Sequence, residues 1–189
     1  MMVTDLRHYL DMLDDAPAPA RRLGTHFAAI VRAASARPAG SGWRSVVGCT
    51  LRHGHRRCEG FIIVFRHLDG EIAWGCDSCG DEGVIRGWEG LPTDVSRLAD
   101  SYADGDAVSL LISRDVSDLL RDVLLMGDAC ELLVARAEGS SAGVLLIGSA
   151  SSFEELFEYV LSEANSETNR ARERRLDEVC DSLEAALAG

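Results

Sequence analysis

Four short apolar segments in the first half of the chain predict β-strands. Each is rich in Val, Ile, Phe or Trp and is bounded by glycine, as the strands of a small sheet are. They cover residues 43–49, 61–66, 72–76 and 83–88. Asp69-Gly70 separates the second segment from the third and predicts a tight hairpin turn, because glycine accepts the positive φ that such a turn requires. The pattern therefore predicts a small antiparallel sheet.

Helical periodicity precedes this sheet. Apolar residues recur at every third or fourth position from Leu23 to Ala34, which predicts an amphipathic helix that begins at Pro19. Residues 4–13 predict a shorter helix that is capped by Thr4. A proline-rich stretch separates the two helices, because proline lacks the backbone donor and has a fixed φ.

The second half of the chain mixes helical and strand periods. Residues 107–112 and 142–149 predict strands, and residues 113–126 predict a helix that ends at Gly127. Residues 129–137 fit a strand that would pair with 142–149, but they also fit a helix. This mixture is typical of a small α+β module.

Two further helices are predicted at the C-terminal end. Ser152 and Glu155 have the spacing of a capping box. An apolar stripe follows on the first helix and consists of Phe153, Leu156, Phe157, Val160 and Leu161. A long polar helix then runs from after Asn165 to about Leu187. One face of this last helix carries Leu176, Val179, Cys180 and Leu183.

Charge divides the chain into two unequal halves. Residues 1–90 carry 11 Arg and 11 acidic residues, whereas residues 91–189 carry 8 Arg and 20 acidic residues. We therefore predict an α+β protein of two modules. N-terminal helices and a small antiparallel sheet occupy 1–92, a linker occupies 93–106, and an acidic α+β module that ends in two helices occupies 107–189.

Composition excludes several functions. All 19 basic residues are Arg, so a lysine Schiff base and a Walker-type phosphate loop are excluded. No apolar run approaches the roughly 20 residues of a membrane span, and the N-terminal residues lack the order of a secretion signal. We therefore expect a cytoplasmic protein without a membrane partner. In that reducing compartment, six cysteines indicate a metal site or buried thiols rather than disulfides.

Three of the six cysteines have the arrangement of metal ligands. Cys76 and Cys79 form a C-x-x-C that is followed at once by Gly80, and glycine relieves backbone crowding in such a tight turn. The predicted hairpin would bring Cys58 to the same end of the sheet as this pair. Thiolates are the usual ligands of structural zinc, so we expect these three residues to bind that metal.

Cys49 is the predicted fourth ligand, and His53 and His55 are the alternatives to it. Cys49 would complete a set of four thiols, but eight residues separate it from Cys58, whereas two to four are usual. His53 and His55 lie between them, and imidazole also binds zinc. Cys130 and Cys180 lie in apolar patterns and are predicted to be core residues.

The cysteine-rich stretch resembles the zinc-ribbon proteins. The resemblance lies in C-E-G at 58–60, followed after a hairpin by W-G-C-D-S-C-G-D-E-G at 74–83. It is strongest to small bacterial proteins with a C-x-x-C-G-D-E-G knuckle, and it covers about residues 43–90. The resemblance implies a zinc-ribbon-like sheet with a structural zinc ion and a role in binding proteins or nucleic acids.

Enzymatic chemistry has little support in the sequence. Redox C-x-x-C sites place the first thiol at a helix N-terminus, where the dipole lowers its pKa. The glycine-rich residues after Cys79 disfavour a helix, and Asp77, Asp81 and Glu82 would raise the thiol pKa. The chain also lacks the H-x-E and H-E-x-x-H motifs of zinc deaminases and hydrolases.

One basic cluster occupies residues 52–57, R-H-G-H-R-R. Arg52, Arg56 and Arg57 could bind phosphate while nearby aromatic residues stack on bases. The net charge of −12 opposes the long-range attraction on which nucleic-acid binding relies.

We therefore expect a non-catalytic protein with a structural zinc ion that acts as a protein-interaction or regulatory factor. Its protein partner is unknown, and homodimerisation through the C-terminal helices is one option. Nucleic-acid binding through the basic loop is the first alternative function, and thiol redox activity of the C-x-x-C is the second.

Overall fold

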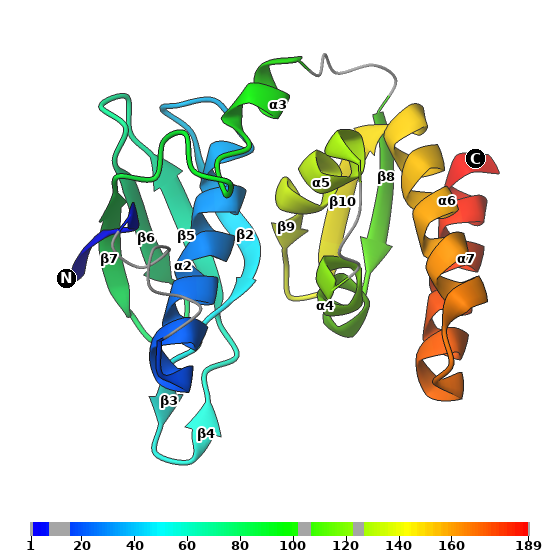
Figure 1. Ribbon diagram of the computed structural model, residues 1–189, viewed down its shortest axis with the longest axis horizontal. Coiled ribbons are helices and arrows are strands. Elements are labelled where there is room, and N and C mark those ends of the chain that lie inside the picture. Colours follow the sequence, from blue (N-terminus) through cyan, green and yellow to red (C-terminus); the bar gives the residue numbers. More distant parts are fainter. Residues whose placement is uncertain (1, 8–15, 102–106, 123–126, 189) are drawn as a thin grey trace. The chain divides into compact units, whose positions relative to one another are not determined.

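Residues 2–7, 16–101, 107–122 and 127–188 are described by the computed structural model of the chain (Figure 1). The chain divides into two units, Met1–Asp100 and Ser101–Gly189. The division falls within the predicted linker, 93–106. Helices and mostly antiparallel strands are present, and two helices end the chain, so the predicted α+β class is confirmed.

Unit 1 contains a five-stranded sheet with the order β1-β7-β6-β5-β2. Its strands are β1 (Met2–Asp5), β2 (Gly42–Gly48), β5 (Phe61–Arg66), β6 (Ile72–Cys76) and β7 (Glu82–Arg86). Neighbouring strands are antiparallel, except that β1 runs parallel to β7. Between β2 and β5 the chain forms a separate two-stranded hairpin, β3 (Arg52–His53) and β4 (Arg56–Arg57).

One helix covers one face of this sheet. α2 (Ala18–Ser35) packs against β2, β5 and β6 (Figure 1), and the short helix α3 (Ser96–Ser101) follows the sheet. Every second residue of a strand faces α2, because successive side chains of a strand point to opposite faces of the sheet. On β6, Ile72, Trp74 and Cys76 are buried in the core beneath α2. On β5, Ile63 and Phe65 point the other way and are exposed.

The four strands predicted in residues 43–88 are all present, and the Asp69-Gly70 turn joins β5 to β6. Gly70 has the positive φ, 87°, that the turn requires. The predicted helix at the N-terminus is wrong at its first residues. Thr4 is buried in β1, where its register partner on β7 is Ile85. Residues 8–13 of that predicted helix lie outside the described residues.

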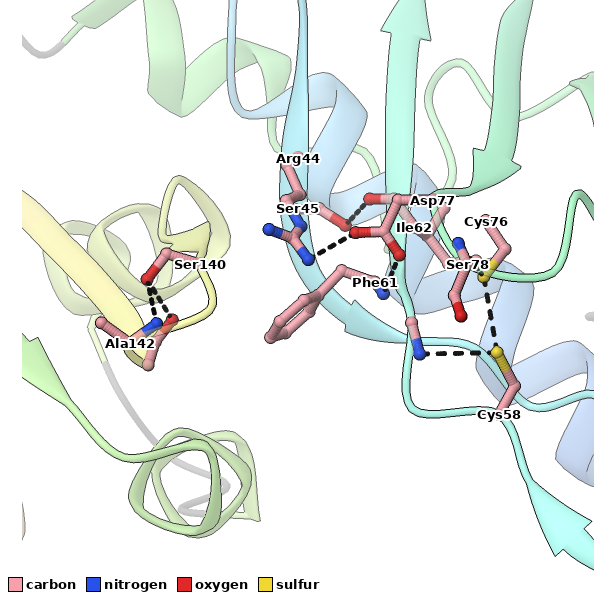
Figure 2. Close-up of polar contacts among 12 residues, drawn as sticks. Arg44, Ser45, Cys58, Phe61, Ile62, Cys76, Asp77, Ser78, Ser140 and Ala142 are labelled. Atoms are coloured by element: carbon pink, nitrogen blue, oxygen red, sulfur yellow. Dashed lines mark hydrogen bonds and ion pairs between the residues drawn. The ribbon is translucent and has the colours of Figure 1, made fainter.

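An irregularity in β2 lies just before the first cysteine of the cluster. The register with β5 shifts between Arg44 and Gly48, and Ser45 is completely buried at this point. The Ser45 hydroxyl donates a hydrogen bond to the Ile62 carbonyl at 2.7 Å (Figure 2). It also accepts one from the Val47 N–H at 3.2 Å. Ser45 therefore satisfies backbone groups that the irregular ladder leaves without a partner.

Unit 2 contains a three-stranded antiparallel sheet with the order β9-β10-β8. Its strands are β8 (Ala107–Ile112), β9 (Glu138–Gly139) and β10 (Val144–Ser149). Its helices are α4 (Arg114–Asp122), α5 (Asp128–Ala135), α6 (Ala150–Ser166) and α7 (Arg170–Ala188). α6 and α7 pack against each other, and the stripe predicted on α7 is buried as expected.

The structure corrects one prediction in unit 2 and decides between two alternatives that the sequence left open. Gly127 begins α5 as its N-cap, whereas it was expected to end the preceding helix; residues 123–126 lie outside the described residues. Most of 129–137 is helical, so the helix alternative is the correct one. Only the two residues of β9 remain to pair with β10.

The cap of α6 also differs from the prediction. The structure places the cap at Ser149, whose hydroxyl accepts a hydrogen bond from the Ser152 N–H at 3.2 Å. Ser152 itself is buried in the first turn of the helix. The helix therefore begins three residues earlier than the Ser152–Glu155 spacing indicated.

Replacement of Ser45 tests the role of the β2 irregularity. We expect Ser45→Ala to lower the free energy of unfolding of unit 1 by about 1–3 kcal/mol, because two buried backbone groups lose their partner. Urea unfolding followed by tryptophan fluorescence measures this, since all three tryptophans lie in unit 1. The control is Ser41→Ala, whose partly exposed hydroxyl donates to the Pro38 carbonyl. Equal stability of the two variants would contradict the assignment.

Candidate metal centre

Four cysteine sulfurs converge at one edge of the unit 1 core. The Sγ atoms of Cys49, Cys58, Cys76 and Cys79 all lie within 4.8 Å of one another. Cys49 and Cys79 are 3.7 Å apart, and so are Cys58 and Cys76. Figure 2 shows the sulfurs of the second pair facing each other. These distances far exceed the roughly 2.05 Å of a disulfide bond, and all four cysteines are free.

The spacing of the sulfurs matches a tetrahedral ligand set. Zinc–sulfur bonds of about 2.3 Å in a tetrahedron place neighbouring sulfurs about 3.8 Å apart. The two 3.7 Å pairs share no residue, so they correspond to two opposite edges of one tetrahedron. The donor set therefore fits one ion that prefers four thiolates.

The site joins the core of unit 1 to its loops. Cys49 and Cys76 are 1% and 7% exposed and belong to the same buried cluster as Trp74. Cys58 and Cys79 are partly buried and pack against that cluster from outside. A metal bound to all four sulfurs would therefore connect two core residues to two residues of the outer turns.

Backbone N–H groups donate hydrogen bonds to three of the sulfurs. The N–H two residues further along donates to Cys49, Cys58 and Cys76, in each case at 3.4 Å. Such donors favour the thiolate form. The pKa of Cys58 is accordingly lowered to about 7, chiefly by the Gly60 N–H.

Burial acts in the opposite direction on the two inner thiols. It raises the pKa of Cys49 and also that of Cys76, because a thiolate in the apolar core lacks solvation. A coordinated dication reverses this preference, since a thiol bound to such an ion is deprotonated. Without a metal, burial therefore disfavours the thiolate form of the two inner sulfurs.

The C-x-x-C occupies a tight turn between β6 and β7. Gly80 has φ 74°, and its N–H donates to the Cys76 carbonyl at 3.3 Å. The Cys76 N–H donates in turn to the Asp81 carbonyl at 2.7 Å. The glycine after the motif therefore has the conformational role that its position indicated. No helix begins at Cys76, so the dipole that activates redox C-x-x-C thiols is absent from this described turn.

Asp77, inside the motif, fixes this turn to the start of β5. Its Oδ1 accepts a hydrogen bond from the Phe61 N–H at 2.9 Å, and its Oδ2 pairs with Arg44 of β2 at 2.5 Å (Figure 2). The sequence indicated only an electrostatic effect of this carboxylate on the thiols. Its role as a positioning residue depends on contacts with strands that are distant in sequence, which no local motif reveals.

Gly60 allows the turn after Cys58 to approach the C-x-x-C closely. A Cβ at this position would lie 2.5 Å from the Cys76 sulfur and 2.7 Å from Asp77 Oδ1. Both distances are shorter than real contacts of a Cβ. A side chain at position 60 would therefore push the turn after Cys58 away from the Cys76 sulfur, which explains the glycine there.

Of the three candidates for the fourth position, the structure places Cys49 together with the other three cysteines. Its sulfur lies within the cluster, and its N–H donates to the Gly60 carbonyl at 2.9 Å. His55 is exposed near the tip of the β3–β4 hairpin. The side chain of His53 lies outside the described residues.

The two remaining cysteines are core thiols. Cys130 is completely buried, its sulfur donates to the Ser152 carbonyl, and burial raises its pKa to about 12. Cys180 is 7% exposed and lies on the buried face of α7, where burial also raises its pKa. Neither has the properties of a reactive thiol.

Comparisons with family models, curated proteins and solved structures find no match for the chain. The resemblance of residues 43–90 to zinc-ribbon proteins therefore stays a prediction. Among the helices in the described residues, none combines the length and apolar character needed to cross a membrane.

Substitution of Gly60 tests whether the close approach of the turn after Cys58 is needed for metal binding. We expect Gly60→Ala to weaken zinc binding by about 10- to 100-fold, the range typical when residues that orient metal ligands are changed. A competition titration against a chromophoric chelator measures the affinity. Gly48→Ala is the matched control, because nothing lies within 4 Å of a Cβ at Gly48. Equal affinities of the two variants would show that close approach at Gly60 does not matter for metal binding.

Proposed function

We propose that Cys49, Cys58, Cys76 and Cys79 bind one zinc ion. The observation that carries this proposal is the convergence of all four sulfurs within 4.8 Å, with two opposite pairs at 3.7 Å. A tetrahedral set of four thiolates is the typical environment of structural zinc, and iron–sulfur centres are the other common occupant of such sets. Measurement of the metal content distinguishes the two.

The role of this zinc is structural. Four thiolates fill a tetrahedral coordination sphere, so no position is left for a water molecule or a substrate. The ligands come from the end of β2, the end of the β3–β4 hairpin and the turn after β6, which the metal would connect. Apparent binding free energies of about 10–16 kcal/mol are known for structural zinc in small domains, so the ion would dominate the stability of this edge.

A non-catalytic binding or regulatory role follows from this closed site. A redox role for the C-x-x-C has less support, because no helix dipole activates Cys76 and burial raises its pKa. The chain would then act through its surfaces, as a factor that contacts a protein partner. Unit 2 carries 18 acidic residues and 7 Arg, which suits it to a basic partner surface.

Homodimerisation through the C-terminal helices stays a prediction. The apolar stripe of α7 is already buried within unit 2, where α7 packs on α6. Leu161 is the one large apolar residue that is exposed on the described residues of these two helices, at 40%. A dimer at this face would therefore be held mainly by polar contacts.

The metal content of the purified protein tests the zinc proposal. We expect one zinc ion per chain by mass spectrometry, two reactive thiols after denaturation without a chelator, and six with one. Cobalt substitution should give the absorption spectrum of a four-thiolate site, which identifies the ligand set without any variant. No metal and six free thiols would overturn the proposal.

The identity of the fourth ligand has a test of its own. Cys49→Ser should lose tight zinc binding, because a neutral hydroxyl replaces a thiolate. The control is His53→Ala combined with His55→Ala, which should keep the affinity of the unchanged protein. Loss of zinc from the histidine variant, with retention by Cys49→Ser, would place a histidine in the site.

Removal of the metal should affect the two units differently. We expect a strong chelator to change the tryptophan fluorescence, because Trp43, Trp74 and Trp88 belong to the same buried core as Cys49 and Cys76. The far-ultraviolet circular dichroism of the helices in unit 2 should be retained, since none of the four ligands lies in that unit. Excess zinc should restore the fluorescence. Unchanged fluorescence on metal removal would contradict a structural role.

A further inference from the structure

The β3–β4 hairpin lies between two residues of the sulfur cluster. Cys49 precedes it and Cys58 follows it, and the Cys58 N–H donates to the Leu51 carbonyl at 2.9 Å. Its turn contains Gly54, at φ 63°. Figure 1 shows the hairpin extending away from the sheet of unit 1. Both ends of this projecting arm are therefore anchored at the proposed zinc site.

Three exposed arginines give the arm its charge. Arg52, Arg56 and Arg57 lie on its two strands, and residues 50–57 contain no acidic residue. Within the described part of the chain, no hydrogen bond or ion pair is found for these three side chains.

Other arginines of unit 1 have clear partners within the protein. Arg44 pairs with Asp77, Arg86 pairs with Glu71, and Arg66 lies over the ring of Trp88 at 5.1 Å. Arg52, Arg56 and Arg57 have no such partner among the described residues.

The register of the arm places two of these charges against each other. Arg52 is directly opposite Arg57, and His53 is opposite Arg56. Residues that are directly opposite project from the same face of a strand pair, and like charges in this arrangement are destabilising. A ladder of two residues per strand offers little to offset the repulsion. An anion bound between the two guanidinium groups would remove it.

The surroundings of the arm contain charges of both signs. The charge of Arg57 lowers the pKa of the buried His26 on α2, whereas Asp81 acts on the same histidine in the opposite direction. Burial is the larger cause and keeps His26 neutral, with a pKa of about 4. Arg57 and Asp81 therefore both act electrostatically on the same residue of α2.

We propose that the β3–β4 hairpin is a nucleic-acid-binding arm that contacts phosphate groups through Arg52, Arg56 and Arg57. Guanidinium groups bind phosphate through paired N–H donors. Arg52 and Arg57 share one face, and Arg56 projects from the other, so the arm carries cations on both faces. A two-stranded ribbon of this kind fits a groove with phosphates on both sides, whereas a flat acidic protein surface would contact only one face. This arm depends on the proposed zinc site for its anchorage.

Full-length, zinc-loaded protein should be titrated against duplex DNA, duplex RNA and single strands by fluorescence anisotropy at several salt concentrations. Three phosphate contacts on a duplex predict a log–log slope of about −2.7, so a fourfold rise in salt should weaken binding by about 40-fold. Replacement of Arg52, Arg56 and Arg57 by Gln should remove most of that slope and most of the affinity at low salt.

The matched control replaces Arg97, Arg170 and Arg174 by Gln. It removes the same three charges from exposed positions on α3 and α7, so it changes the net charge equally. We expect its affinity for nucleic acid to stay within about twofold of the unchanged protein, because binding of phosphate depends on direct contacts. Equal loss in both triple variants would overturn the proposal, as would absence of binding to every nucleic acid at low salt.

Polyglutamate distinguishes nucleic acid from an acidic protein partner. If it binds as tightly as nucleic acid, with the same dependence on the three arginines, the assignment to nucleic acid is overturned. Zinc content should be measured on the same samples. Binding that depends on the arginines in protein without zinc would refute the zinc proposal and leave the arm in place. Full zinc occupancy without any binding would refute only the arm.

Discussion

The meeting of four sulfurs at the end of three adjacent strands is the constraint on which the rest of unit 1 depends. In the sheet order, β5 lies between β6 and β2, so Cys76 at the end of β6 and Cys49 after β2 come from opposite sides of the same central strand. Both are core residues, and the backbone around them is already paired. A tetrahedral ion at this point would connect β2 and β6 directly. Without it, these two strands are held together at this end only through their hydrogen bonds to β5.

The electrostatics of the site explain why a metal would suit this position better than four free thiols. The two inner thiols are disfavoured as thiolates by burial, whereas the N–H groups two residues after three of the cysteines point at the sulfurs and favour that form. A bound dication would stabilise the thiolate form of all four sulfurs, including the two that burial disfavours as thiolates. Gly60 permits the chain after Cys58 to approach the Cys76 sulfur closely, and Asp77 fixes the C-x-x-C turn to the start of β5.

The sequence predicted those parts of the molecule that depend on local patterns. β5 and β6 were found at their true bounds because alternation and flanking glycines are local signals. The sequence left the assignment of Cys49 as a ligand provisional, because paired zinc-binding cysteines are usually two to four residues apart. Here the β3–β4 hairpin is inserted between Cys49 and Cys58. β1 was mistaken for a helix start because its partner, β7, is about 80 residues away. Residues 129–137 were ambiguous because nearly every side chain of α5 is buried, which removes the helical period.

A basic arm on an acidic protein has a physical consequence for selectivity. Most non-specific affinity for nucleic acid comes from long-range attraction and the release of counterions, and the 18 acidic residues of unit 2 against its 7 Arg oppose the approach of any polyanion. The affinity of the proposed arm would then come from its own contacts with phosphates, and its full affinity would require both of its cationic faces to be engaged at once. A groove satisfies that requirement and an extended strand does not. The two-faced geometry of the arm should therefore favour a duplex or a folded RNA over unstructured single strands.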